Sequence, residues 1–392
     1  MHRNTSGTTK SLCMKSTHEP MINMKKRIEG LQTLRGIAFL LIFVSHCSFI
    51  TSRTTYFGAF GVSLFIVLSG FLDMVRFDEK PSENTSTRVK GKLKKVYPLH
   101  IVTMVGALPF AVHDIILGSE SVSGLIAKIV ANLLLLQGYI PVKTMYFSLN
   151  AVAWYLTLVL TVTVISPRLA CLIKRIKNVT CTNANNYARW GGIACAIIII
   201  LQTIWSAVCK NSTAFHWMIY INPLLRILDY ILGMISGYVY VARQENSEDT
   251  HEHRRIPKPI AVCTFIIATL AMLIISCLKE ESPWMLVVVW APLSTAAVYI
   301  FALSEDFPKS FRRLLFENKA LEWIGNISFE LFLIHQLVIR YWNSIMLPIE
   351  TIIMKVASAF ICLALSIMCA YIWRLIIQSL KQTVVKAANS KN

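Results

Sequence analysis

Two polar side chains, Arg35 and His46, lie within the apolar stretch Leu31 to Ile50, which otherwise has the composition of a membrane-spanning helix. An ionisable group inside a bilayer costs roughly 2.5 to 3.5 kcal/mol, so such groups usually face a cavity or a partner. At about 100° per residue, their spacing of eleven positions returns them to within about 20° of one helix face, about 16 Å apart along the axis. One face therefore carries a permanent cation near its start and an imidazole that can exchange a proton.

Basic residues gather before another apolar stretch. Lys92, Lys94 and Lys95 precede Tyr97 and Pro98. Lysines at the mouth of a span either extend to lipid headgroups or bind a polyanionic ligand such as a phosphate, and the sequence leaves both interpretations open.

Four further segments carry polar or aromatic groups in apolar surroundings. The aromatic pair Trp154 and Tyr155 follows Asn150 and precedes Thr157, a pattern that is typical of an interfacial belt. Arg226 and Asp229 are three positions apart, so we expect them to neutralise one another on one helix. His335 lies in another apolar run, where a hydrogen-bonded structural role is the plainer interpretation. Ser69 lies among small residues (Gly58, Gly61, Ser63 and Gly70) that favour close helix packing.

The elements that must position these residues are membrane helices. The chain of 392 residues is 55% hydrophobic and 15% charged, and its mean hydropathy is +0.55, which excludes an ordinary soluble domain. Apolar runs of about 17 to 25 residues predict an all-α bundle of about ten transmembrane helices, at residues 31–50, 57–75, 96–117, 149–167, 190–208, 217–241, 259–278, 284–303, 323–346 and 351–377. A polar N-terminal tail (1–28), a membrane domain (29–378) and a cytoplasmic C-terminal tail (379–392) are the predicted parts.

The distribution of positive charge predicts the orientation. Lysine and arginine concentrate in the loops at 76–95, 168–189, 242–258 and 304–319, and such loops stay in the cytoplasm. Both termini are then cytoplasmic, and the weaker run 125–140 is a re-entrant or outer-surface segment. Positive-inside loops also account for most of the net charge of +18. The ten cysteines contain no C-x-x-C pair, so we predict no metal site.

The order of several motifs resembles acyltransferase family 3, the integral membrane O-acyltransferases of the polysaccharide O-acetyltransferase type, from about residue 29 to 378. LRGIAFLLIFVSH resembles the family's signature of an arginine, ten residues and a histidine, and FGVSLFIVLSGFL resembles its second-helix motif. KLKKVYPLH has Lys92 and Lys95 where relatives usually have arginines. NAVAWYLTLVLTVTVISP, NPLLRILDYILGMISG and IGNISFELFLIH resemble later motifs. Two departures are Val159, where many relatives have a glutamate, and Thr157, where they have a serine.

The resemblance implies transfer of an acyl group, most often acetyl, from a coenzyme A thioester at the cytoplasmic side to a hydroxyl of a cell-surface glycan or lipid-linked saccharide. His46 would act as general base, or as a transient acyl carrier. Arg35 would be the second catalytic residue, and with Lys92 and Lys95 it would bind the phosphates of the donor or orient its acyl end. The remaining residues expected to line the substrate pocket are Asn150, Trp154, Tyr155, Thr157, Arg226 and His335, with Asn150 a possible contact of the oxyanion or the acceptor.

The resemblance also implies the surroundings of the reaction. Acetyl-CoA is expected as a donor substrate, and no metal or prosthetic group is expected. The partners would be acyl-CoA, the saccharide acceptor and membrane lipids, with no nucleic acid, in a bacterial cytoplasmic (inner) membrane.

Two other classes remain open from the residues alone. A transporter or flippase would use Arg35, His46, Arg226, Asp229 and His335 as a substrate or proton path. A non-catalytic scaffold would leave the free-energy cost of Arg35 and His46 unexplained.

Overall fold

The computed structural model describes residues 28–49, 55–79, 84–180, 186–250, 259–278, 289–345 and 351–389. Within these ranges every regular element is helical, which confirms the predicted all-α class. The long helices are α1 (Glu29–His46), α2 (Thr55–Glu79), α3 (Thr85–Ile116), α6 (Trp154–Thr180), α7 (Tyr187–Cys209), α8 (Pro223–Thr250), α9 (Pro259–Leu278), α13 (Ser328–Ile345) and α14 (Ile352–Asn389). The shorter ones are α4 (Val122–Leu133), α5 (Lys143–Tyr146), α10 (Trp290–Ala302), α11 (Lys309–Leu315), α12 (Lys319–Asn326) and the single turns η2 (Gln137–Tyr139), η3 (Ala151–Ala153), η5 (Trp217–Ile221) and η7 (Ser304–Asp306).

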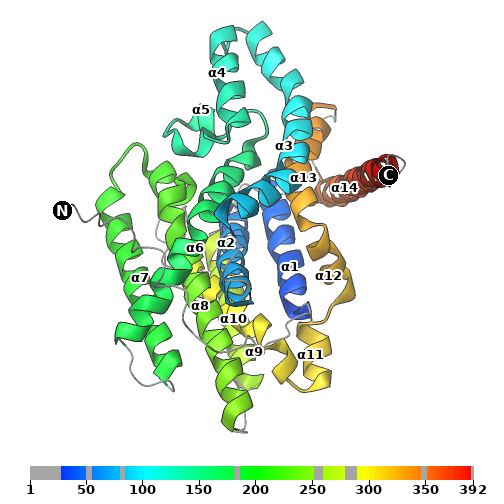
Figure 1. Cartoon of the computed structure of the whole chain (residues 1–392). Helices are drawn as coiled ribbons and strands as arrows, with labels where there is room; N and C mark the ends of the chain where they lie inside the picture. The colour runs from blue at the N-terminus through cyan, green and yellow to red at the C-terminus, as the bar shows by residue number, and fades with distance from the viewer. Residues whose placement is uncertain are drawn as a thin grey trace, which may run out of the picture.

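Helix α1 lies inside the bundle, in contact with α2 on one side and with α12 and α13 on the other (Figure 1). Helix α2 packs in turn against α8, and α8 packs against α7, which lies at the margin of the bundle. The short helices α4 and α5 project from one end (Figure 1). The helix that carries Arg35 and His46 is therefore surrounded by protein, as the free-energy cost of its polar residues requires.

Among the residues that the structure describes, six helices are long and apolar enough to cross a membrane: Tyr56–Asp78, Thr85–Ile116, Ala151–Val179, Tyr187–Cys209, Pro223–Glu245 and Ile352–Thr383. The chain is therefore a multi-pass membrane protein. The predicted count of ten and the cytoplasmic location of both termini stay predictions. Residues 1–27 of the predicted tail, and 284–288 of a predicted span, lie outside the described residues.

Several predicted boundaries are wrong, for local reasons. Helix α1 ends at His46, four residues before the predicted end of its span, so the imidazole lies at a helix terminus. Helix α3 begins eleven residues earlier than predicted, because the Asn84 side chain accepts a hydrogen bond from Ser86 N and caps it. The predicted span 323–346 is divided at Ile327 into α12 and α13, where Ser328 Oγ donates to the Gly325 carbonyl.

The weak run 125–140 forms α4 and η2. Helix α4 has 12 residues, a length of about 18 Å, which is shorter than a hydrocarbon core of about 30 Å. Such a length agrees with a segment that does not span the bilayer.

Two glycines of α2 allow the helices beside it to approach closely. A side chain at Gly61 would collide with the Ala38 carbonyl oxygen of α1, and one at Gly70 would collide with the Tyr230 carbonyl oxygen of α8. The predicted packing role of these small residues is therefore confirmed, and it involves α8 as well as α1.

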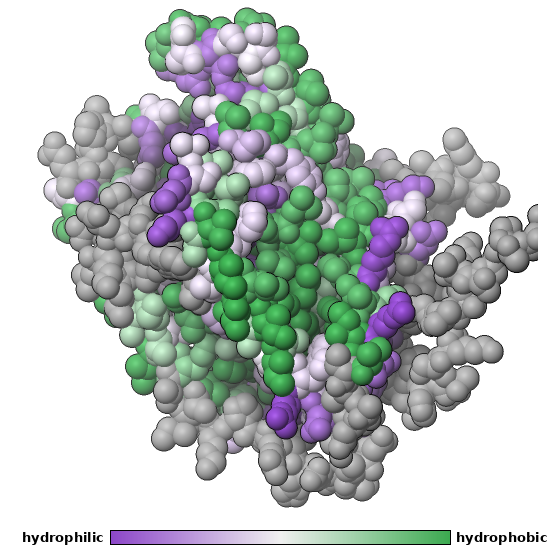
Figure 2. All heavy atoms as spheres, turned by 90° about the vertical axis from the view of Figure 1, so that its left-hand side faces the viewer, coloured by the Kyte–Doolittle hydropathy of each residue, from purple (hydrophilic) through white to green (hydrophobic). Residues whose placement is uncertain are grey.

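Hydrophobic side chains cover the margin of the bundle. The exposed residues of α7 include Ile193, Ile197, Ile200, Leu201, Ile204 and Val208. Figure 2 shows hydrophobic residues gathered across the middle of the face on this side of the molecule. Such a surface suits contact with lipid chains.

Candidate active site

The central feature of the site is a pair of histidines from two helices. His46, at the end of α1, and His335, in the middle of α13, have ring centroids 4.9 Å apart and nearly perpendicular planes at 76°. His335 Nε2 lies 3.3 Å from His46 Nδ1. His335 is fully buried, whereas His46 is half-buried. Of the two residues, only His46 keeps accessible surface.

Backbone carbonyls fix the tautomer of both rings. His46 Nδ1 lies 2.8 Å from the Ile42 carbonyl oxygen, and His335 Nδ1 lies 2.9 Å from the Leu331 carbonyl oxygen. A carbonyl oxygen only accepts, so both Nδ1 atoms carry a proton when the rings are neutral. His335 Nε2 is then a lone pair 3.3 Å from His46 Nδ1, whose single hydrogen points mainly to the closer Ile42 carbonyl and is shared with His335 as a second acceptor. His46 Nε2 is the lone pair left for a substrate proton.

A loop before α6 holds the turn of α13 that contains His335. Asn150 Nδ2 donates to the Leu333 carbonyl at 2.8 Å, and Val152 N donates to Gln336 Oε1 at 3.1 Å. Leu149 has a left-handed backbone with φ of 54°, which a leucine adopts only where its surroundings enforce it. The Asn150 side chain therefore fixes the backbone of α13 two residues before His335.

Aromatic rings connect the histidine pair to the start of α6. Phe332 lies 6.2 Å from His335 and 5.2 Å from Tyr155, and Trp154 lies 6.1 Å from Tyr155, all between ring centroids. Trp154 is buried and also contacts the ring of Tyr220 at 5.3 Å. Tyr155 is thus linked to His335 through Phe332, and Trp154 through Tyr155 and Phe332, while their place in a substrate pocket stays a prediction.

Arg35 lies on the opposite part of α1, beside other polar groups. Its Nη1 donates to Gln32 Oε1 at 3.4 Å, and its charge acts on the Lys92 amine and on the Tyr155 hydroxyl. The Tyr155 hydroxyl is also hydrogen-bonded with Ser69. Lys92 is half-buried and Lys95 is exposed, so the predicted donor residues form a cluster that reaches from the surface into the bundle.

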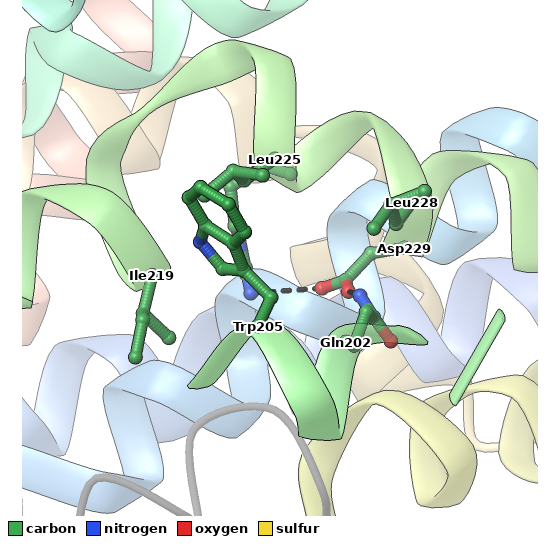
Figure 3. A pocket seen from close by; sticks show the side chains of 7 residues that line it. Gln202, Trp205, Ile219, Leu225, Leu228 and Asp229 are labelled. Atoms are coloured by element: carbon green, nitrogen blue, oxygen red, sulfur yellow. Dashed lines mark hydrogen bonds and ion pairs between the residues drawn. The ribbon is translucent and has the colours of Figure 1, made fainter. Parts of the chain in front are cut away.

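Arg226 is held in a buried network. Its Nη1 forms an ion pair with Asp229 Oδ2 at 2.8 Å, and its Nη2 donates to Ser63 Oγ at 3.1 Å. Gln202 Nε2 donates to Asp229 Oδ1 at 2.7 Å. Arg226, Asp229 and Gln202 of this network line a small, partly open hollow, with Trp205 as one wall. Figure 3 shows Gln202 and Asp229 pointing toward each other there. The expected ion pair is confirmed.

Thr157 is not part of either cluster. Its buried hydroxyl accepts a hydrogen bond from Gly138 N at 3.3 Å, which joins α6 to η2. The sequence reasoning also missed the half-buried Asp73 and the buried Arg88, whose ion pair of 3.3 Å lies beside Lys92. The helical spacing of Arg88 from Lys92 was a usable signal, whereas nothing in the sequence indicated Asp73.

Comparison with known proteins decides the family. The chain matches the acyltransferase domain model over residues 28–373, which is most of its length. The chain belongs to acyltransferase family 3. A curated relative, acyltransferase MdmB of Streptomyces mycarofaciens, is 24% identical over 342 residues, 82% of this chain and 81% of the relative. No solved structure matches this acyltransferase. Within the described residues, no group of three or more metal-binding side chains is found.

Proposed function

We propose that this membrane acyltransferase transfers an acetyl group from acetyl-CoA, bound at the cytoplasmic side, to a hydroxyl of a cell-surface glycan or lipid-linked saccharide. The donor and the acceptor class come from the family resemblance. The observation that carries the chemistry is the placement of His46: its Nδ1 is held by the Ile42 carbonyl at 2.8 Å and lies 3.3 Å from His335 Nε2, so Nε2 of His46 is the nitrogen that can take a proton.

The proposed reaction has two bond changes at the thioester carbonyl. His46 Nε2 takes the proton of the acceptor hydroxyl as its oxygen attacks, which forms the new C–O bond. Breaking the C–S bond releases coenzyme A, and the leaving thiolate takes the proton back from His46. Because the thioester is already activated, the protein has to position it, remove one proton and stabilise an oxyanion.

His335 has a defined part in this scheme. When His46 holds the substrate proton, its ring is an imidazolium, and the bond from Nδ1–H to His335 Nε2 becomes charge-assisted. The arrangement resembles the logic of a catalytic triad, in which a buried acceptor orients the base and stabilises its cationic form. His335 is therefore a positioning residue, and His46 is the residue that meets the substrate.

The donor residues near the start of α1 and the histidine pair at its end would have different roles. Arg35 and Lys92 lie toward the end of the bundle that positive-inside counting assigns to the cytoplasm, and His46 lies about 16 Å farther along the helix. The donor's phosphates would bind at the first position and its acyl end would reach the second. Trp154 and Tyr155 would line the space between them.

The proposal is tested with purified full-length protein in lipid nanodiscs. Acetyl-CoA labelled in the acetyl group is incubated with a panel of polysaccharides and lipid-linked oligosaccharides, and ester-bound label is measured. We expect a labelled, alkali-labile ester on at least one acceptor. Movement of an acceptor across a vesicle membrane with no ester formed would instead favour a transporter.

Replacing His335 with leucine is expected to lower kcat by about 30- to 100-fold and to leave the KM values within about twofold, because only the orientation and charge of His46 are affected. Glutamine, which offers an oxygen acceptor, should retain more activity than leucine. The measurement is steady-state acyl transfer. Tyr341→Phe is the matched control, since Tyr341 donates from the same helix to Gly106 O, away from the histidines. Equal turnover in the leucine variant and the wild type would exclude the positioning role.

A further inference from the structure

The hollow beside Gln202 lies between α7 and α8, at the lipid-facing margin of the bundle. Trp205 of α7 forms one wall and is exposed, and the half-buried Leu225 and Leu228 of α8 form another (Figure 3). The exposed positions beside them in the sequence are also apolar, namely Leu201, Ile204 and Leu224. A ligand that enters the hollow from this side therefore comes from the lipid phase.

The hollow lies near one end of both helices. Gln202 is seven residues, or about 10 Å, before the end of α7, and Arg226 is the fourth residue of α8. Positive-inside counting assigns this end to the side opposite the cytoplasm. Groups that bind at a membrane interface enter the boundary between headgroups and acyl chains by about 5 to 10 Å. The headgroup of an amphiphile can therefore reach the depth of the hollow.

Three buried polar atoms at this place have no hydrogen-bond partner among the described residues. They are Gln202 Oε1, Arg226 Nε and Ser206 Oγ. Gln202 and Arg226 line the hollow, and Ser206 lies one turn after Gln202 on the same face of α7. A buried polar atom without a partner costs free energy, and native proteins leave few of them. A ligand that supplies the missing bonds is therefore favoured.

The missing bonds define the chemistry of this ligand. The amide oxygen of Gln202 only accepts, the Nε–H of Arg226 only donates, and the hydroxyl of Ser206 does both. The charge is already balanced, because Arg226 is paired with Asp229 at 2.8 Å. An anion would leave the amide oxygen without a donor, and a cation would leave the Nε–H without an acceptor. A neutral hydroxyl, which both donates and accepts, fits all three atoms.

We propose that this hollow is a lateral binding site for the neutral, hydroxyl-bearing headgroup of an amphiphile that enters from the lipid phase. The hollow is small, so it takes one hydroxymethyl group or the edge of one sugar ring, and the hydrocarbon chain lies along Trp205. An indole ring suits this position because it is common where membrane and water meet. The ion pair of Arg226 with Asp229 keeps its structural role. The inference does not depend on the proposed acyl transfer.

The test is photo-crosslinking of the full-length protein in phosphatidylcholine nanodiscs. The probe is decyl glucoside with a diazirine on the first carbons of its chain, and labelled residues are mapped by mass spectrometry of peptides. We expect labelling of α7 and α8 beside Trp205. Excess unlabelled decyl glucoside or monodecanoylglycerol is added in separate arms, and the better competitor identifies a sugar or a glycerol headgroup. Decyltrimethylammonium and decyl phosphate, which carry charged headgroups, are expected not to compete.

Two variants and one control locate the binding atoms. Gln202→Leu and Ser206→Ala are each expected to reduce labelling by about fivefold, the effect of one lost hydrogen bond of about 1 kcal/mol. Ser206→Ala removes a hydroxyl that has no partner among the described residues, so the fold is expected to stay intact even if Gln202→Leu disturbs Asp229. The control is Thr203→Val, because the Thr203 hydroxyl already donates to the Ile199 carbonyl at 2.8 Å. Its labelling should stay within twofold of the wild type.

Three results would overturn the site. The first is labelling of Ser206→Ala equal to that of the wild type. The second is labelling spread evenly over the lipid-facing residues of α7 and α14, which would show contact of the chain alone. The third is equal competition by the charged amphiphiles, which would show that the hydroxyl groups are not recognised. Each of these results leaves the proposed acyl transfer unaffected, because no acyl donor is present.

Discussion

Replacing His46 with alanine is expected to lower the rate of acyl transfer by about a thousandfold, within the range known for positioned general bases. Alanine leaves no group to take the acceptor proton at the position of Nε2, although the donor cluster about 16 Å away along α1 is unchanged. The measurement is the initial rate of labelled ester formation, normalised to the amount of protein in the membrane. Coenzyme A affinity should stay within about twofold.

Ser48→Ala is the matched control for this experiment. Ser48 is exposed and lies two positions after His46, so its hydroxyl can be removed without touching the histidine pair. We expect wild-type rates from this variant. A His46→Ala protein that folds to normal amounts and retains more than a tenth of the activity would show that His46 is not the base.

Replacing Arg226 with glutamine is expected to lower the free energy of unfolding by about 3 to 5 kcal/mol, the usual effect of removing one partner of a buried ion pair. Arg226 and Asp229 are 1% and 0% exposed, so the remaining carboxylate would be left without its cation in a desolvated place. The measurement is denaturant unfolding in a fixed detergent. The double variant Arg226→Gln/Asp229→Asn, which removes both charges, should recover most of the loss.

The same pair of variants distinguishes a structural from a substrate-binding role. If Arg226 contacts the acceptor, the single variant would keep its stability and raise the KM for the acceptor, and the double variant would not restore that KM. If the pair is structural, stability changes first and the KM of the folded fraction does not change. The bond from Arg226 to Ser63 supports the structural result, because it joins α8 to α2.

Sequence reasoning indicated the helix that carries the candidate site, and it named His335 for the pocket only through the family resemblance, without pairing it with His46. Arg35 and His46 could be identified because a polar side chain within an apolar run carries a free-energy cost. That pattern involves neighbouring residues only, so it can be seen in the sequence alone. His335 lies 289 positions from His46, and no spacing rule joins them. Its apolar surroundings favoured a structural histidine. The rings of His335 and His46 come close to one another only after α1 and α13 have packed.

Helix ends were less predictable than helix cores. Hydropathy indicated α3 from its apolar part, but the helix extends through the basic segment because Asn84 caps it farther upstream. For the same reason Arg88 was counted as a loop charge rather than as part of a helical face. The division between α12 and α13 was also missed, because the predicted span of residues 323–346 continues across Ile327.

The close contact of α2 with α8 at Gly70 has a consequence for motion. The same two helices are joined by Tyr230 with Asp73 and by Arg226 with Ser63, so polar bonds lie on both sides of the contact. Sliding one helix past the other would break both bonds and press side chains into a backbone that has no room for them. Any opening of the bundle that admits or releases substrate therefore moves α2 and α8 together as one rigid unit.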